Sequence, residues 1–267
     1  MAESNDGVRP GIDRAWLAEA VRRDPVMHSL AAWDLDHEPD RARILSCGPP
    51  REPAAYLLLW WGDPQRPAVH WVGDPTAGAP LLEHLPPRPL VVLGPEALVP
   101  AIESRRGPIV ARGIARLTVR PTAPVPGSDD PRVRAVGPID GERLRLWAHR
   151  HADPMVQGYA FFDPARHLVW AAWDERDRVA GVCFASARLP EIWTFTAIYV
   201  EPERRGAGIG TALTAHATEA ARRAGAIAHL NVRLDNPGAR RIYERLGYRE
   251  RDRIASMESV GDGPHNG

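Results

Sequence analysis

Apolar and polar positions divide the N-terminal half of the chain into short strands and amphipathic helices. Apolar residues recur at helical spacing over residues 12–23, and Asp24-Pro25 ends that helix. Residues 54–61 are almost wholly apolar, as in a buried strand. The pattern predicts helices at Ile12–Arg23, Val26–Trp33, Leu81–Leu85 and Pro95–Arg106, strands at Arg41–Cys47, Pro53–Trp61, Pro67–Val72, Leu90–Leu93 and Ala111–Val119, and a tail over residues 1–10.

The C-terminal half shows the same kinds of pattern in a more regular order. Leu213, Ala217 and Ala220 give its longest helix an apolar stripe, and Arg176-Asp177-Arg178 forms the turn between two strands. The pattern predicts strands at Val133–Val136, Leu168–Trp173, Val179–Ala187, Ile192–Val200, Ala226–Leu234 and Tyr248–Met257, and helices at Asp140–Arg150, Met155–Phe162, about 206–224 and Gly238–Leu246. The fold class is therefore α/β with a mixed sheet.

A Pro-rich stretch separates the two halves. Residues 121–131 read P-T-A-P-V-P-G-S-D-D-P, which is typical of a linker. We therefore expect an auxiliary domain over 1–120, a linker over 121–131, a catalytic domain over 132–260 and a Gly-rich tail over 261–267.

The most informative local feature is the turn that follows the strand Ile192–Val200. Residues 199–211 read Y-V-E-P-E-R-R-G-A-G-I-G-T. Glycines at this spacing allow left-handed backbone, and the unpaired N–H groups of a helix N-terminus bind phosphate. A plain tight connection is the alternative. A nucleotide P-loop is excluded because the chain has no Lys, and the Rossmann spacing G-x-G-x-x-G does not fit Gly206, Gly208 and Gly210.

Two motifs, in order, resemble those of the GNAT superfamily of N-acetyltransferases. The first is R-x-x-G-x-G, at Arg205, Gly208 and Gly210, and the second is N-x-x-A-x-x-x-Y-x-x-x-G-[FY], from Asn236 to Tyr248. The resemblance covers about residues 132–260. It implies the GNAT acyltransferase fold, acetyl-coenzyme A as co-substrate, and transfer of the acetyl group to an amine by direct attack.

The resemblance also implies a set of site residues. Tyr243 matches the general acid that protonates the thiolate of coenzyme A, whereas the alternative is a tyrosine packed on an amphipathic helix. Asn236 matches a pantetheine contact, and it also suits the N-cap of the helix that starts at Pro237. The residues expected to bind the co-substrate are Ile198, Tyr199, Val200, Arg204, Arg205, Gly206, Ala207, Gly208, Ile209, Gly210, Thr211 and Asn236.

The resemblance does not settle the general base. Some branches of the family have a Glu five residues before the conserved Asn, and here that position is Asn231. Glu191, at the start of the central strand, is the nearest carboxylate for this role, and a solvated turn residue is the alternative. Further candidates are His149, His151 and Asp163, or a chain of water molecules.

Aromatic residues flank the expected acceptor groove, although aromatic side chains are usually core. They are Tyr159, Trp170, Trp173 and Trp193, of which Trp170 and Trp173 are expected on opposite faces of their strand. Cys183, in an apolar strand, is expected in the core.

A faint internal repeat suggests that the chain is a tandem duplication. Asp24-Pro25 and Trp33-Asp34 recur at the same spacing as Asp153-Pro154 and Phe162-Asp163. Where the N-terminal half would carry its own loop, residues 71–80 lack the Arg and the G-x-G, so we expect a degenerate copy that does not bind coenzyme A. An unrelated small α/β domain is the alternative.

Composition narrows the function classes further. The chain of 267 residues has formal net charge +0, and all 34 of its basic residues are Arg, which we interpret as a bacterial coding bias. We expect no nucleic-acid or membrane partner. Its 2 cysteines are far apart, which favours a reducing cytoplasm and gives no metal site.

The expected reaction is the acetylation of a primary amine, and the acceptor is expected to be a small molecule. The alternatives are an acyltransferase that uses a longer acyl-coenzyme A and a non-catalytic acyl-coenzyme A sensor. The N-terminal half is expected to close over the acceptor or to form a homodimer surface.

Overall fold

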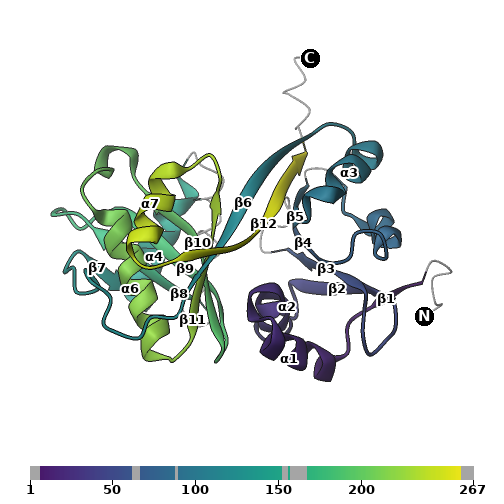
Figure 1. The fold of residues 1–267 in the computed structure, drawn as a ribbon. Helices are drawn as coiled ribbons and strands as arrows, with labels where there is room; N and C mark the ends of the chain where they lie inside the picture. The colour runs from purple at the N-terminus through teal and green to yellow at the C-terminus, as the bar shows by residue number, and fades with distance from the viewer. Residues whose placement is uncertain (1–6, 62–66, 88–89, 152–155, 157–166, 260–267) are drawn as a thin grey trace, which may run out of the picture. The chain divides into compact units, whose positions relative to one another are not determined.

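The computed structural model describes residues 7–61, 67–87, 90–151, 156 and 167–259 (Figure 1). They fold into two compact units, one within 1–114 together with 253–267 and the other within 115–252. The predicted helix Met155–Phe162 lies outside the described residues except for Val156, which is buried. Tyr159, Asp163 and the tail 261–267 also lie outside them.

The first unit is a mixed sheet with helical segments on both faces. Leu17 of α1 and Ala31 of α2 pack with Tyr56 and Leu58 of β3 on one face. Leu81 of η1 and Ile102 of α3 pack with other strand residues on the opposite face. Its elements are β1 (Val8–Pro10), α1 (Arg14–Arg23), α2 (Pro25–His37), β2 (Ala42–Cys47), β3 (Ala55–Trp60), β4 (Ala68–Gly73), the 3-10 helices η1 (Ala79–His84) and η2 (Glu96–Leu98), β5 (Val91–Gly94), α3 (Val99–Arg106) and the start of β6 (Ile109–Val119).

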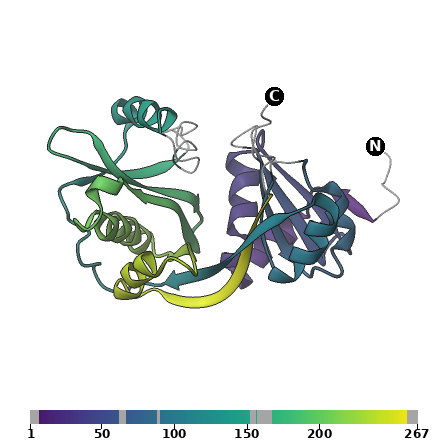
Figure 2. The same ribbon diagram turned by 90° about the horizontal axis from the view of Figure 1, so that it is seen from above.

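The second unit is also layered, with α4 on one face of its sheet and α6 and α7 on the other (Figure 2). In the sheet, β10 pairs antiparallel with β9 and parallel with β11. Its elements are the end of β6, β7 (Val133–Ala135), α4 (Pro138–His149), β8 (Leu168–Trp173), β9 (Val179–Arg188), β10 (Ile192–Val200), the 3-10 helix η4 (Pro202–Arg204), α6 (Ile209–Arg223), β11 (Ile227–Arg233), α7 (Pro237–Arg245) and the start of β12 (Arg249–Ser259).

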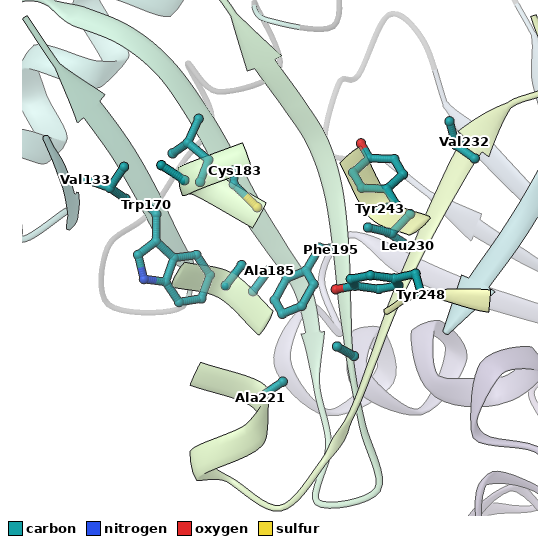
Figure 3. Close-up of a cluster of buried hydrophobic side chains, with 14 of the residues drawn as sticks. Val133, Trp170, Cys183, Ala185, Phe195, Ala221, Leu230, Val232, Tyr243 and Tyr248 are labelled. Atoms are coloured by element: carbon teal, nitrogen blue, oxygen red, sulfur yellow. The ribbon is translucent and has the colours of Figure 1, made fainter. Parts of the chain in front are cut away.

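The larger core of the second unit lies between its sheet and the helices α6 and α7. It includes Trp170, Phe195, Leu230, Tyr243 and Tyr248 (Figure 3). A second core on the opposite face contains Leu144 of α4 and Trp173. These two apolar cores hold β10 and α7 in place. Both elements carry residues that the sequence motifs predict to take part in the reaction.

The same succession of elements occurs in both units. Three antiparallel strands, β2–β4 or β8–β10, are followed by a helical segment, a parallel strand, a helix and a final strand. The final strand of the second succession, β12, pairs with β5 of the first unit through Ala255–Glu258. The end of β6 instead contributes Ala115 and Leu117 to the core of the second unit. The tandem arrangement expected from the sequence is therefore present, with the last strands exchanged.

Several boundaries differ from the sequence prediction. Val8–Pro10 forms a strand paired with β2, whereas a tail was expected, because a three-residue strand has no apolar pattern of its own. The second unit ends at Asp252 and not at residue 260, because the remainder of β12 belongs to the first unit. Residues 121–131 lie within the second unit, where Val125 is buried.

Glu219 of α6 fixes this Pro-rich segment. Its carboxylate accepts a hydrogen bond of 3.2 Å from the N–H of Val125 and pairs with Arg222 and Arg223 at 2.7 and 2.9 Å. Hydrogen bonds from Arg222, and then from Arg223 and Val125, lower the pKa of Glu219 to about 2. The carboxylate therefore stabilises the fold above its unfolded pKa, and this stability is lost as pH falls towards 2.

Replacing Glu219 with Gln is expected to destabilise the protein at pH 7 by about 1–2 kcal/mol, because charge-assisted hydrogen bonds are lost. The difference from wild type should shrink as pH falls below 4.5, where the unfolded carboxylate becomes protonated, and vanish near pH 2. Denaturant unfolding at several pH values measures it. Glu142→Gln, which removes an exposed pair with Arg145, is the control and should cost under about 1 kcal/mol. Equal and pH-independent losses in both variants would contradict the assignment.

Candidate functional site

The turn between β10 and α6 holds two glycines in left-handed backbone. The φ angles of Gly206 and Gly208 are 80° and 79°, which disfavour any residue with a Cβ. These angles explain why α6 begins at Ile209 and not at residue 206 as predicted. Gly208 is the N-cap of α6 and has no side chain that could accept from the first turn. The first N–H groups of α6 are therefore available to an anion, which the helix dipole also favours.

This turn opens onto a groove with a volume of about 890 Å³. Its walls come from the end of β10, the turn, the start of α6 and one side of α7. The lining residues are Val200, Arg204, Arg205, Gly206, Gly208, Ile209, Gly210, Thr211, Gly238, Arg241, Ile242, Glu244 and Arg245. The structure thus brings together most of the residues that the sequence assigned to the co-substrate.

The groove is cationic, because four arginines and one glutamate line it. Arg204 is partly neutralised, since its guanidinium pairs at 2.6 Å with Asp174, whose side chain is only 4% exposed. Hydrogen bonds from Arg178 are the largest cause that lowers the pKa of Asp174. Arg205 is exposed and donates to the carbonyl of Val200 at 3.2 Å. Arg205 therefore brings more uncompensated charge to the groove than Arg204 does.

Four of the predicted co-substrate residues do not line the groove. Ile198 packs against the core between the sheet and α6, and the carbonyl of Ala207 accepts a hydrogen bond from Arg132. Asn236 caps α7, since its side chain accepts from the N–H of Ala239 at 3.1 Å. The side chain of Tyr199 packs in the core on the opposite face of the sheet.

Tyr199 belongs to a small polar cluster at the end of β10. Its hydroxyl lies 3.1 Å from Nε2 of His151 and donates to Glu201 at 3.4 Å. Trp147 of α4 donates to the same carboxylate at 2.7 Å. These contacts join the end of β10 to α4, and they place His151 in a structural network.

The strand β10 is irregular in its second half. Its pairing with β9 shifts register between Thr196 and Tyr199, and Ala197 has a φ of 50°. Its parallel pairing with β11 runs from Ile192 to Phe195 and ends there, although β10 continues to Val200. The backbone beyond Phe195 is therefore not used in a β10–β11 ladder.

Tyr243 lies on α7 and points into the core, where its side chain is 7% exposed. Figure 3 shows it beside Leu230 of β11, and its ring centroid lies 6.0 Å from that of Tyr248. Burial, and to a smaller extent the neighbouring Cys183, raises the pKa of the Tyr243 phenol. The phenol is therefore a neutral hydrogen-bond donor throughout the physiological pH range.

The structure does not place Glu191, the predicted general base, near Tyr243 or the groove. Glu191 lies in the turn between β9 and β10, where its carbonyl accepts from the N–H of Ile227. Extended strand of this length separates it by roughly 17 Å from Thr196, where β10 and β11 part. His149 is exposed at the end of α4. The structure therefore gives no support to Glu191 as the base.

The aromatic residues expected near an acceptor are mainly core. Trp170 and Trp173 lie on opposite faces of β8, as predicted, and each is buried. Trp193 packs against the same core as Trp170. Cys183 is fully buried, which raises the pKa of its thiol, and the prediction that it is a core residue is confirmed.

The first unit has a different turn after β4. The carboxylate of Asp74 accepts hydrogen bonds of 2.7 and 2.9 Å from the N–H groups of Thr76 and Ala77, and the carbonyl of Asp74 accepts from Gly78. The backbone donors that a phosphate would need are thus already bonded within the turn. A short 3-10 helix, η1, follows in place of a long α-helix.

The second unit thus has the features of an acyltransferase domain, with a glycine turn at a helix N-terminus and a parted pair of parallel strands. Residues 138–248 match the model of the acetyltransferase (GNAT) family. The segment 138–248 is therefore a domain of the GNAT acetyltransferase family.

Curated relatives match only parts of the chain. An uncharacterized N-acetyltransferase of Methanocaldococcus jannaschii is 46% identical over 56 residues, which are 21% of this chain and 25% of the relative. A mycothiol acetyltransferase of Kocuria rhizophila is 33% identical over 98 residues, which are 34% of this chain and 32% of the relative. The chain therefore spans a third or less of the length of these relatives.

Solved structures resemble nearly the whole chain in fold. A tandem GNAT protein from the clavulanic acid biosynthesis pathway aligns with a TM-score of 0.56 and 13% identity, covering 96% of this chain and 99% of the other. A GCN5-related N-acetyltransferase from Sphaerobacter thermophilus aligns with a TM-score of 0.57 and 16% identity, covering 97% and 96%. These alignments show that the fold of a tandem GNAT protein covers nearly the whole chain, including its N-terminal half.

The contribution of α7 to the groove was not predicted from the sequence. Gly238, Arg241 and Arg245 repeat at helical spacing on one side of α7, and this stripe was the available signal. Over the residues that the structure describes, no helix is long and apolar enough to span a membrane. Over the same residues, no group of three or more His, Cys, Asp or Glu is arranged to hold a metal ion.

Proposed function

We propose that this protein transfers the acetyl group of acetyl-coenzyme A to a primary amine of a small molecule. The observation that carries the proposal is the glycine turn, which presents the N–H groups of α6 to a groove lined by four arginines. A pyrophosphate needs such a set of backbone donors and positive charge. The proposed setting is a bacterial cytoplasm.

Each part of the reaction has a group that suits it. The N–H groups at the start of α6, with Arg205, Arg241 and Arg245, hold the pyrophosphate. The backbone of β10 beyond Phe195, which β11 does not pair, offers hydrogen bonds to the pantetheine arm. As the amine nitrogen bonds to the carbonyl carbon and the carbon–sulfur bond breaks, Tyr243 gives its proton to the thiolate. The proton that the amine loses leaves to water, and water returns a proton to the phenolate of Tyr243.

A non-catalytic acyl-coenzyme A sensor is the second candidate. The position of Glu191 favours a sensor. Glu191 was the predicted general base, and it lies at the end of β10 that is far from the groove. The first unit is not expected to bind coenzyme A, because Asp74 already occupies the donors of its turn.

Two measurements on the full chain test the proposal. Calorimetric titration with acetyl-coenzyme A is expected to show one site per chain, and a longer acyl-coenzyme A tests the chain-length alternative. Release of free thiol is then followed with three primary amines: a polyamine, an amino-acid amide and an amino sugar. Binding with amine-dependent thiol release supports the transferase, and binding without it supports the sensor. An absence of binding would reject both.

A further inference from the structure

The strands β10 and β11 part at one position. Their last paired residues are Phe195 and Leu230, yet β11 continues to Arg233. The first residues beyond that pair are Thr196 on β10 and Asn231 on β11. These are therefore the first residues of the two strands that the β10–β11 ladder leaves unpaired.

Asn231 lies on the face of the sheet opposite to Tyr243. Ala228, Leu230 and Val232 of β11 belong to the core that contains Tyr243. Because successive side chains of a strand point to opposite faces, His229 and Asn231 point to the other side. The opening thus has the phenol of Tyr243 on one face and a polar side chain on the other.

The neighbours of Asn231 on this face form hydrogen bonds with one another. Nδ1 of His229 lies 3.3 Å from the hydroxyl of Thr194, and both residues are buried. The carbonyl of Thr194 accepts a hydrogen bond from Ser186 at 3.2 Å. Ser186, Thr194 and His229 therefore make up a bonded polar row that ends beside the opening.

Asn231 differs from this row. Its side-chain oxygen Oδ1 is buried and has no hydrogen-bond donor in the part of the chain that the structure describes. The residue as a whole is only partly buried, so some of its surface remains accessible. A buried acceptor without a donor is a costly arrangement that folding alone does not favour. A ligand that carries an N–H group would supply the missing donor.

We infer that Asn231 binds the acceptor amine, with Oδ1 accepting one N–H of the nucleophilic nitrogen. This inference rests on the proposed function. An amide oxygen takes no proton at neutral pH, so Asn231 holds the amine and leaves its lone pair directed at the carbonyl carbon. A primary amine can provide such a donor, whereas a thiol is a weak one. Asn231 therefore favours nitrogen acceptors over thiols.

Two substitutions of Asn231 separate this role from a structural one. Asn231→Leu has similar volume and no acceptor, and it is expected to raise the KM for the amine about tenfold or more. Its dissociation constant for acetyl-coenzyme A should stay within twofold of wild type, and its Tm should not fall, because no hydrogen bond is lost. Asn231→Asp keeps an acceptor oxygen, so its KM should stay within about threefold of wild type.

Ser186→Ala is the matched control on the same face of the sheet. It removes a hydrogen bond that is satisfied in the structure, so it should lower the Tm by a few degrees and leave the KM for the amine unchanged. The probe is whichever of the polyamine, the amino-acid amide and the amino sugar wild type acetylates fastest.

The outcomes distinguish this inference from the proposed function. If wild type acetylates an amine and Asn231→Leu shows an unchanged KM, the inference about Asn231 is wrong while the proposed function stands. A Tm loss in Asn231→Leu as large as that in Ser186→Ala, with Asn231→Asp equally impaired in KM, would identify a structural role instead. If wild type binds no acetyl-coenzyme A or acetylates none of the three amines, the proposed function and the inference fall together.

Discussion

Replacing Gly208 with Asp is expected to raise the dissociation constant for acetyl-coenzyme A at least about a hundredfold, because two or more charge-assisted hydrogen bonds are lost. At the N-cap of α6, an Asp carboxylate would accept the first N–H groups of the helix, as Asp74 does in the turn of the first unit. It would also place a negative charge where the pyrophosphate is expected. Calorimetric titration of wild type and variant measures the difference.

The Gly208 variant is expected to fold. A Cβ at this position would meet only a guanidinium nitrogen of Arg132, at 3.9 Å. The left-handed backbone is the remaining cost, and Gly127 matches it, since its φ is 78° and nothing lies within 4 Å of its added Cβ. Gly127→Asp is therefore the control, which has the same backbone cost and is expected to keep full binding. If both variants bind acetyl-coenzyme A equally well, the glycine turn only connects β10 to α6 and does not bind the pyrophosphate.

Much of the second unit was predictable because its signals are local. The strand Ile192–Val200, the glycine turn and the helix after it each have a strong pattern of their own, and only the start of the helix, at Ile209 in place of residue 206, differs from the prediction. The opposite faces of Trp170 and Trp173 follow from strand alternation alone. The tandem arrangement was also predicted, from two Asp-Pro steps in the sequence, of which Asp153-Pro154 lies outside the described residues.

The rest depends on contacts between residues far apart in the chain. The pairing of β12 with β5 joins residues more than 150 positions apart, and no periodicity of either strand indicates its partner. Glu191 seemed close to the reaction because it is close in sequence to β10, but the strand extends away from it. The parting of β10 and β11 and the orphan oxygen of Asn231 likewise exist only in three dimensions.

Replacing Tyr243 with Phe is expected to lower kcat by about a hundredfold or more, which is the usual contribution of a general acid. The dissociation constant for acetyl-coenzyme A should stay within twofold of wild type, because the phenol does not line the groove that we propose holds the pyrophosphate. Thiol release with a saturating amine measures kcat, and calorimetry measures the binding.

Tyr248→Phe provides the matched control, because Tyr248 lies in the same core with its ring 6.0 Å from that of Tyr243. Its hydroxyl is buried and hydrogen-bonded to Thr218 at 2.8 Å. Removing it should therefore cost about 1–2 kcal/mol of stability and leave kcat within about twofold. Tyr243→Phe should show the reverse pattern, with kcat lost and stability kept, because its ring still fills the core. If kcat falls in proportion to stability in both variants, Tyr243 contributes only to packing. If kcat is unchanged in Tyr243→Phe, Tyr243 is not the general acid.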